Sequence, residues 1–262
     1  MLRMKLAGLL VLLFFLSSCI KNNERPSWIR IDKWSMEANP ELNGTEGELT
    51  LNFEDAWVYI DDNIVGVFQL PVKIPVLQEG QKKISIYPAV RNNGISATKA
   101  VYPFCQGYII NANLVRNEVL DLKPVTSYYS NCKFWIEDFE QAGIKLDTDP
   151  SSNADLERIL HSEADVYGQY YGHINLSLTD SLWTGYTTGE MVLPKGGADV
   201  YLEIDYKNTN NILTGVLGFL NTGTVKDNQN IRLNNACFFS RNFGKGIAQH
   251  IHVIPAYVGN DG

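Results

Sequence analysis

Hydrophobic and polar positions alternate in short runs between Trp28 and Leu122. This alternation is typical of β-strands that bury one face, because successive side chains point to opposite sides of a strand. Turn-forming Gly, Asn, Asp and Pro residues separate the runs. The pattern predicts strands at WIRIDKW, LTLNF, AWVYI, IVGVFQL, VKIPVL, KISIYPAV, YIINANLV and EVLDL.

A tight turn is predicted between AWVYI and IVGVFQL, where Asp61, Asp62 and Asn63 stand in sequence. Asp and Asn tolerate the left-handed backbone conformations that a short hairpin turn requires. We therefore expect these two runs to form an antiparallel hairpin.

The segment 123–132 (KPVTSYYSNC) ends this periodic region, and its proline and small polar residues predict a joint. Beyond it, FWIEDFE at 134–140 has the alternation of a first strand, and further short strands are predicted up to QHIHVIPAYV. Residues 155–162 are predicted to form one or two helical turns. The expected fold is all-β, with a small β domain at 28–123 followed by a β-sandwich or jelly roll at 133–262.

The first of these domains resembles a known family. Residues 56–90, with VYIDDNIVGVFQLP and LQEGQKKISIYPAV, resemble a PEGA-type module, which pairs a V-Y-V-D-G hairpin with a later glycine turn and strand. Asp62-Asn63 replaces the usual turn glycine, and Leu70-Pro71 stands where Thr-Pro is common. The resemblance implies a PEGA-like β domain that binds or spaces and carries no catalytic residues.

The second domain, at about 133–258, resembles the galactose-binding-like jelly rolls that include many carbohydrate-binding modules. The resemblance is carried by its opening F-E strand and by VYLEIDY. Relatives of this kind are expected to have a closing strand after VIPAYVGNDG, so the sandwich is expected to be incomplete at its C-terminus.

The N-terminus has the features of an export signal. Arg3 and Lys5 precede an apolar run at 6–16 (LAGLLVLLFFL). This run is shorter than the ~20 residues that a membrane-spanning helix needs, and it fits the hydrophobic region of a secretory signal.

The residues that follow, Leu16 to Cys19 (LSSC), resemble the bacterial lipobox. The resemblance implies a lipoprotein signal peptide at 1–18, lipidation of Cys19 by acyl chains such as palmitate, and a polar tether at 19–27. Several acyl chains hold a protein firmly to a membrane. The alternative is an ordinary signal peptide with an incidental cysteine. Taken whole, the chain resembles outer-membrane lipoproteins of Bacteroidetes-type bacteria, anchored on either the periplasmic or the surface face.

Charge limits the partners that the chain can have. Without the two basic residues of the signal, 20 of the 22 basic residues remain against 29 acidic ones. The basic residues are also scattered, so no nucleic-acid-binding surface is predicted. The expected partners are the membrane, through the lipid anchor, and an envelope protein or a glycan.

Three cysteines follow Cys19, namely Cys105, Cys132 and Cys237. Export permits disulfides, and Cys105–Cys132 is the predicted bridge, which would stabilise the fold by roughly 3–4 kcal/mol on the entropic model. The alternative is that these cysteines stay free and buried. His250 and His252 share one face of a predicted strand, but two ligands do not make a zinc site.

Glu137, Asp138 and Glu140 lie among the aromatic residues of FWIEDFE. Paired carboxylates about 5–9 Å apart cleave glycosidic bonds, but such pairs come from separate elements and no second acid cluster is evident. The three acids are also a candidate calcium site, because calcium takes hard oxygen ligands, with Glu203 or Asp205 as additional ligands. The remaining interpretation is that they face solvent. Structural calcium is the one cofactor that the sequence suggests.

Tyr170, Tyr171, Trp183 and Tyr186 lie close together in the sequence. Exposed tyrosine and tryptophan rings stack on sugar rings, because they present a flat apolar face with a polar rim. These residues are therefore a candidate ligand platform, and the alternative is that they belong to the core. Trp183, in a polar setting, is the residue most expected to be exposed.

The sequence therefore predicts a lipid-anchored, non-catalytic lipoprotein of the outer membrane that acts as a binding or structural component of the envelope. The alternative is a carbohydrate-binding surface lipoprotein. No motif of a nucleotide-binding or hydrolytic enzyme is present.

Overall fold

The computed structural model describes residues 25–49, 51, 53–91, 96–161, 168–189 and 199–204, and the backbone of strands at 218–219, 225–226 and 256–258. Within these ranges the chain is essentially all-β, with curled antiparallel sheets of the sandwich or jelly-roll type, as the alternation predicts. No helix in the described part is both long and apolar enough to cross a membrane. Cys19 and the signal peptide lie outside the described residues.

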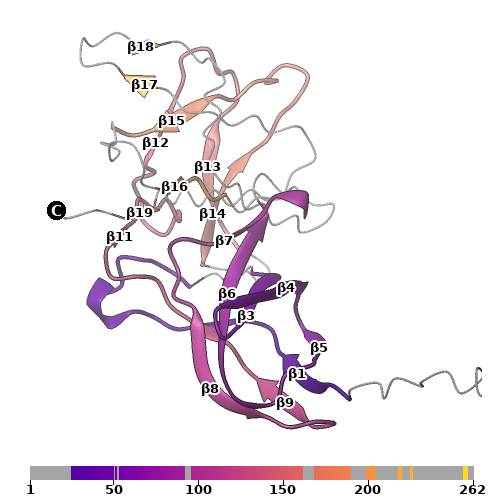
Figure 1. Cartoon of the computed structure of the whole chain (residues 1–262). Coiled ribbons are helices and arrows are strands. Elements are labelled where there is room, and N and C mark those ends of the chain that lie inside the picture. The colour runs from indigo at the N-terminus through magenta and orange to yellow at the C-terminus, as the bar shows by residue number, and fades with distance from the viewer. Residues whose placement is uncertain are drawn as a thin grey trace, which may run out of the picture.

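A five-stranded sheet dominates the first half of the chain (Figure 1). It consists of β3 (Asp55–Ile60), β4 (Asn63–Gln69), β6 (Gly80–Arg91), β7 (Lys99–Val101) and β8 (Tyr108–Leu114). The strand order is β4-β3-β6-β7, and β8 also pairs with β6. The long strand β6 makes this arrangement because it pairs with β8 through residues 80–86 and with β7 through residues 89–91.

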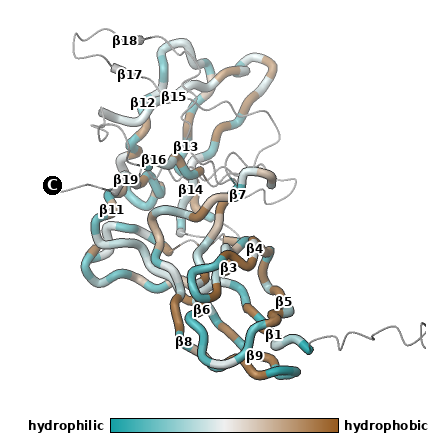
Figure 2. The backbone as a smooth tube through the Cα atoms, viewed as in Figure 1, coloured by the Kyte–Doolittle hydropathy of each residue, from teal (hydrophilic) through white to brown (hydrophobic). Residues whose placement is uncertain are grey.

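A three-stranded sheet contributes to the same core. Its central strand β1 (Ser27–Ile31) pairs antiparallel with β5 (Val72–Val76) and parallel with β9 (Val119–Leu122). Figure 2 shows hydrophobic stretches along the strands of this half. The two sheets join in one buried cluster because each turns its apolar face inward, with Ile29 and Ile31 from β1 and Val58, Ile60, Ile84 and Ile86 from β3 and β6.

The predicted hairpin turn is confirmed. Asp61 and Asp62 have φ values of 49° and 62°, which is the left-handed region expected for this turn, and Asn63 begins β4. Lys82 pairs with Asp61 at 2.7 Å, and Lys83 pairs with Asp62 at 2.9 Å. The turn is therefore held against the beginning of β6 by two ion pairs.

The segment 123–132 contributes Tyr128 and Cys132 to a second core cluster. Its strand β10 (Val125–Thr126) pairs in parallel with β2 (Ser35–Met36), and short 3-10 turns occur at η1 (Pro40–Leu42) and η3 (Ser96–Thr98). The cluster comprises Leu42, Val90, Tyr102, Phe104, Cys105, Tyr128, Cys132 and Tyr201. The boundary predicted from proline and small polar residues therefore runs through a core to which both halves contribute.

The second half consists of short strands in small sheets. β12 (Leu146–Thr148) pairs with β15 (Gly185–Thr187), and β13 (Leu156–Leu160) pairs with β14 (Tyr170–Ile174). β11 (Cys132–Lys133) and β16 (Val200–Tyr201) both pair with β19 (Ala256–Val258). β17 (Gly218–Phe219) pairs with β18 (Val225–Lys226). Other strands predicted between 190 and 255, together with Asp205, Cys237, His250 and His252, lie outside the described residues.

Two local predictions for this half are wrong. Residues 155–162 do not begin a helix, because Leu156–Leu160 forms strand β13, and pairing with β14 outweighs the weak helical preference of the segment. Residues 134–140 form a loop instead of a first strand, and Phe139 within it has a φ of 59°. In the first half, the described residues of LTLNF also lie outside strands.

Candidate functional site

The five-stranded sheet has one face in the core and one face turned outward. Because side chains alternate along a strand, Val58 and Ile60 of β3 point into the core, while Trp57 and Tyr59 point to the opposite face. Tyr87 of β6 lies on this outer face because it is paired with Trp57. The outer face is thus built by two central strands, whose backbones are fixed by neighbours on both sides.

The pairing register arranges this face in rows. Tyr59 lies opposite Ile64 of β4 and Ser85 of β6, and Ser85 in turn lies opposite Ile109 of β8. Ile64 is 59% exposed and Ile109 is 51% exposed. Large apolar side chains at the two ends of one row therefore face solvent, with aromatic and polar side chains between them.

The aromatic rings of the outer face contact one another. The Trp57 and Tyr59 rings are stacked with centroids 6.5 Å apart, and the Tyr59 and Tyr87 rings meet edge to face at 5.8 Å. A Cβ atom on Gly107 would lie only 2.4 Å from the Tyr87 ring, so glycine at this position leaves the room that the ring occupies. Tyr87 is thereby held in a fixed position beside Tyr59.

These rings border a hollow of about 350 Å³, lined by Tyr59, Asp62, Ser85, Tyr87 and Val101. We refer to it as the sheet hollow. The hydrogen bond from Lys82, followed by that from the Lys83 backbone, lowers the pKa of Asp61, while the Asp62 carboxylate raises the pKa of Lys83. The edge of the hollow therefore carries acids that are already balanced by lysines.

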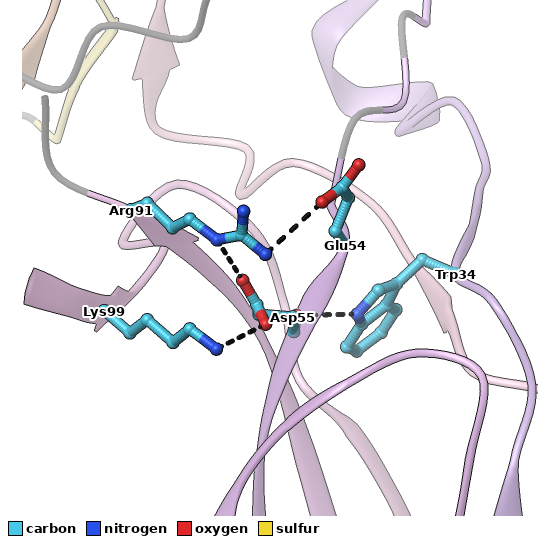
Figure 3. A network of polar contacts seen from close by, with 5 residues as sticks. All are labelled: Trp34, Glu54, Asp55, Arg91 and Lys99. Atoms are coloured by element: carbon cyan, nitrogen blue, oxygen red, sulfur yellow. Dashed lines mark hydrogen bonds and ion pairs between the residues drawn. The ribbon is translucent and has the colours of Figure 1, made fainter. Parts of the chain in front are cut away.

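A network of ion pairs is centred on the buried carboxylate of Asp55 (Figure 3). The Asp55 carboxylate is buried and accepts hydrogen bonds from Arg91 Nε at 2.8 Å and Lys99 Nζ at 2.7 Å. Arg91 also pairs with Glu54 at 3.3 Å, and the Trp34 indole N–H donates to the Asp55 carbonyl. The hydrogen bond to Asp55 raises the pKa of Arg91. The Asp55 carboxylate is paired with two cations, so this network connects β3, β6 and β7. The same pairing means that the Asp55 carboxylate is not free to act as a base.

The carboxylates predicted as calcium ligands accept hydrogen bonds from backbone N–H groups. Glu137 is only 1% exposed, and its carboxylate accepts the N–H groups of Phe139 and Lys145. Asp138 accepts the N–H of Glu140, while the Glu140 carboxylate accepts two N–H groups of the segment that begins β14. No metal-binding group of three or more His, Cys, Asp or Glu side chains occurs among the described residues, Glu203 included. The geometry thus does not support a shared calcium ion at Glu137, Asp138 and Glu140.

The four aromatic residues predicted as a platform are divided between two ribbons. On β14, the Tyr170 ring packs against the Arg158 guanidinium at 3.2 Å, and the Tyr171 ring packs against His161 at 4.6 Å. Near β15, Trp183 Nε1 donates to the Thr148 hydroxyl at 3.3 Å, and Tyr186 is 37% exposed. Tyr170 and Tyr171 are consecutive on β14 and point to opposite faces of it, whereas Trp183 and Tyr186 belong to the β12–β15 ribbon.

The two predicted disulfide partners are free, buried thiols in the second core cluster. Cys132 Sγ donates to the Phe104 carbonyl at 3.5 Å, so the two cysteines approach the same loop without a bond between them. Burial raises the pKa of Cys132 to about 11 and that of Cys105 well above its usual value. Neither thiol is thus set up as a reactive thiolate.

Comparison of the chain with family models, curated proteins and solved structures finds no match. The PEGA-like and jelly-roll resemblances therefore stay predictions. The sheet hollow was missed by sequence reasoning, although one signal for it was present: in AWVYI the two aromatic residues alternate with the aliphatic ones, which places both rings on the face opposite the core.

Proposed function

We propose that this protein is a lipid-anchored, non-catalytic binding component of the bacterial outer membrane, and that the outer face of the five-stranded sheet is its binding surface. The observation that carries the proposal is the row of Ile64, Tyr59, Ser85 and Ile109 across four paired strands, in which Ile64 and Ile109 face solvent at the two ends, Tyr59 is half-buried and Ser85 is buried. Exposed apolar surface of this kind marks interaction sites.

The acid side chains support a non-catalytic role. Asp55 is occupied by two cations, and Glu137 accepts two backbone N–H groups. A general acid or base has to be within hydrogen-bond reach of a substrate proton, and these carboxylates are already engaged in holding the fold.

The binding surface can be tested with a photo-cross-linking amino acid. p-Benzoylphenylalanine in place of Ile109 on β8 is expected to cross-link an envelope component in intact cells. The matched control is the same residue in place of Leu160 on β13, which is 59% exposed, against 51% for Ile109, but lies outside the sheet. Cross-links from position 160 and none from position 109 would contradict the proposal.

The anchor is tested separately, because Cys19 lies outside the described residues. Cells fed labelled palmitate are expected to label the wild-type protein and to leave a Cys19→Ser variant unlabelled and released from the membrane fraction. Equal labelling of the two proteins would remove the lipid anchor from the proposal and leave the binding surface to be judged by the cross-linking result.

The alternative function is carbohydrate binding, for which Tyr170, Tyr171, Trp183 and Tyr186 were predicted as the platform; they lie on two ribbons. The sheet hollow provides a second set of aromatic residues for the same function.

A further inference from the structure

The sheet hollow has the dimensions of a small-ligand site. Its volume of about 350 Å³ lies at the lower end of the range of about 300–1,000 Å³ that such sites occupy. A single ring with its substituents fits this space, whereas a helix of ~10 Å diameter does not.

The lining combines flat apolar surfaces with hydrogen-bonding groups. Tyr59 and Tyr87 both line the hollow, and their rings meet at an interplanar angle of 85°. Ser85 and Asp62 contribute a hydroxyl and a carboxylate to the same lining. A ligand that matches this corner has an apolar face and a rim of hydroxyl groups, which is the amphipathic character of a sugar ring.

The charges around the hollow favour an uncharged ligand. Asp62 is the one charged side chain among the described lining residues, and Lys83 pairs with it at 2.9 Å. Asp61 is likewise paired with Lys82. No unbalanced lysine or arginine faces the lining residues that the structure describes, as a phosphate or carboxylate ligand would require.

The lining residues also contact neighbouring strands and side chains. Tyr59 lies on β3 between β4 and β6, Tyr87 fills the space that Gly107 leaves, and the Asp62 turn is fixed by ion pairs to β6. A preformed site avoids the entropy loss of ordering its side chains on binding.

We propose that the sheet hollow binds a neutral saccharide, with one sugar ring against Tyr59 and Tyr87 and with a hydroxyl group bound by the exposed carboxylate of Asp62. This inference rests on the proposed function, since it names the ligand class of the same surface.

The experiment uses the chain from residue 19 onward with Cys19→Ala, so that it is soluble without its lipid. A microarray of neutral gluco-, manno-, xylo- and galacto-oligosaccharides identifies the ligand, and calorimetric titration with that oligosaccharide follows. We expect Tyr59→Ala and Tyr87→Ala each to weaken binding at least tenfold, because each removes a ring face. Tyr87→Phe retains the ring and is expected to bind within a few-fold of wild type.

Two further variants separate binding from folding. Asp62→Gly removes a carboxylate that is 76% exposed while allowing the left-handed backbone of the turn, and it is expected to weaken binding severalfold without loss of structure. Tyr186→Ala, on the separate ribbon β15, is the control and is expected to bind as wild type does.

Binding lost in the two tyrosine variants and retained in Tyr186→Ala supports the inference. Failure of every neutral oligosaccharide to bind, or binding unaffected by both tyrosine variants, overturns it. If the saccharides fail while the cross-link from position 109 persists, the proposed function stands with a protein as its partner. If no saccharide binds and position 109 gives no cross-link, the proposed function is contradicted as well.

Discussion

The two halves of the chain are held together by different interactions. The first half packs aliphatic side chains from long paired strands into a closed core, and β6 alone is 12 residues long. The second half, between 134 and 189, has strands of three to five residues, and its loops are held by carboxylates that accept backbone N–H groups.

The difference shows how strand length decides what stabilises a β structure. A long strand buries several side chains on one face, whereas a strand of three residues buries one or two and leaves many loop N–H groups without a sheet partner. Buried Glu137 provides the missing acceptor for two of them. A functional surface that needs rigid side chains is therefore better placed on the first half.

The largest effect is expected from Ile86→Ala in the first half. Ile86 is fully buried in the first core cluster, and truncation of a buried isoleucine costs about 2–5 kcal/mol in the free energy of unfolding. Urea unfolding of the Cys19→Ala chain measures the change. Ile64→Ala on β4, which is mostly exposed, is the control and is expected to change stability by less than ~1 kcal/mol. Equal losses of unfolding free energy in the two variants would mean that Ile64 is buried in the protein in solution.

A smaller effect is expected from Glu137→Gln in the second half. The substitution turns one of the two acceptor oxygens into a donor facing an N–H group, and leaving a buried N–H unpaired costs about 1–3 kcal/mol. Hydrogen exchange is expected to accelerate between Phe139 and Lys145 while β3 and β6 stay protected.

The same variant tests the calcium prediction. If Glu137 serves the backbone, neither added calcium nor a chelator changes the melting temperature of the wild-type protein. A calcium-dependent rise in melting temperature that Glu137→Gln abolishes would restore the ion site and show that the carboxylate can exchange its backbone partners for a metal.

The sequence predicts the first half well and the second half poorly, for one physical reason. In AWVYI and KISIYPAV the alternation of side chains reflects burial of one face of the strand. Both strands and their core residues can therefore be predicted from the sequence. FWIEDFE shows a similar pattern but forms a loop. Glu137 is buried there and accepts a backbone hydrogen bond, and Phe139 is packed in the interior.

The candidate site, too, could be predicted from the sequence only in part. That Trp57 and Tyr59 share a face can be derived from their spacing, but their meeting with Tyr87 and Ser85 depends on the register between β3 and β6. Register is set by long-range pairing, which a single sequence does not display. The aromatic residues near Trp183 were predicted because they are neighbours in sequence, whereas the hollow is assembled from three separate segments of the chain, at 59–62, 85–87 and 101.

The smallest effect is expected in the cluster where the halves meet. Burial raises the pKa of Cys132 from 9.0 to about 11. The unfolded chain loses this proton at lower pH than the folded chain does, so the stability contribution is fully present below pH 9.0 and is lost as the pH rises towards 11. Cys132→Ala is expected to make unfolding free energy less dependent on pH in this window.

Alkylation distinguishes free thiols from the predicted bridge. In a Cys19→Ala, Cys237→Ala chain near pH 8, Cys105 and Cys132 are expected to resist iodoacetamide while folded and to react once denaturant exposes them. Resistance that persists in denaturant until a reductant is added would establish the disulfide.

The hydrogen bond from Tyr102 to Glu203 joins residues 101 positions apart, and Tyr201 packs edge to face on both Tyr102 and Phe104. During synthesis the chain emerges with its N-terminus first. The β3–β4 hairpin and its pairing with β6 need only nearby residues and can form early, whereas the second cluster stays open until residue 203 has been added. A pause in synthesis before that point would leave Tyr102, Phe104 and Cys105 exposed, which makes this interval the one in which a chaperone has most to protect.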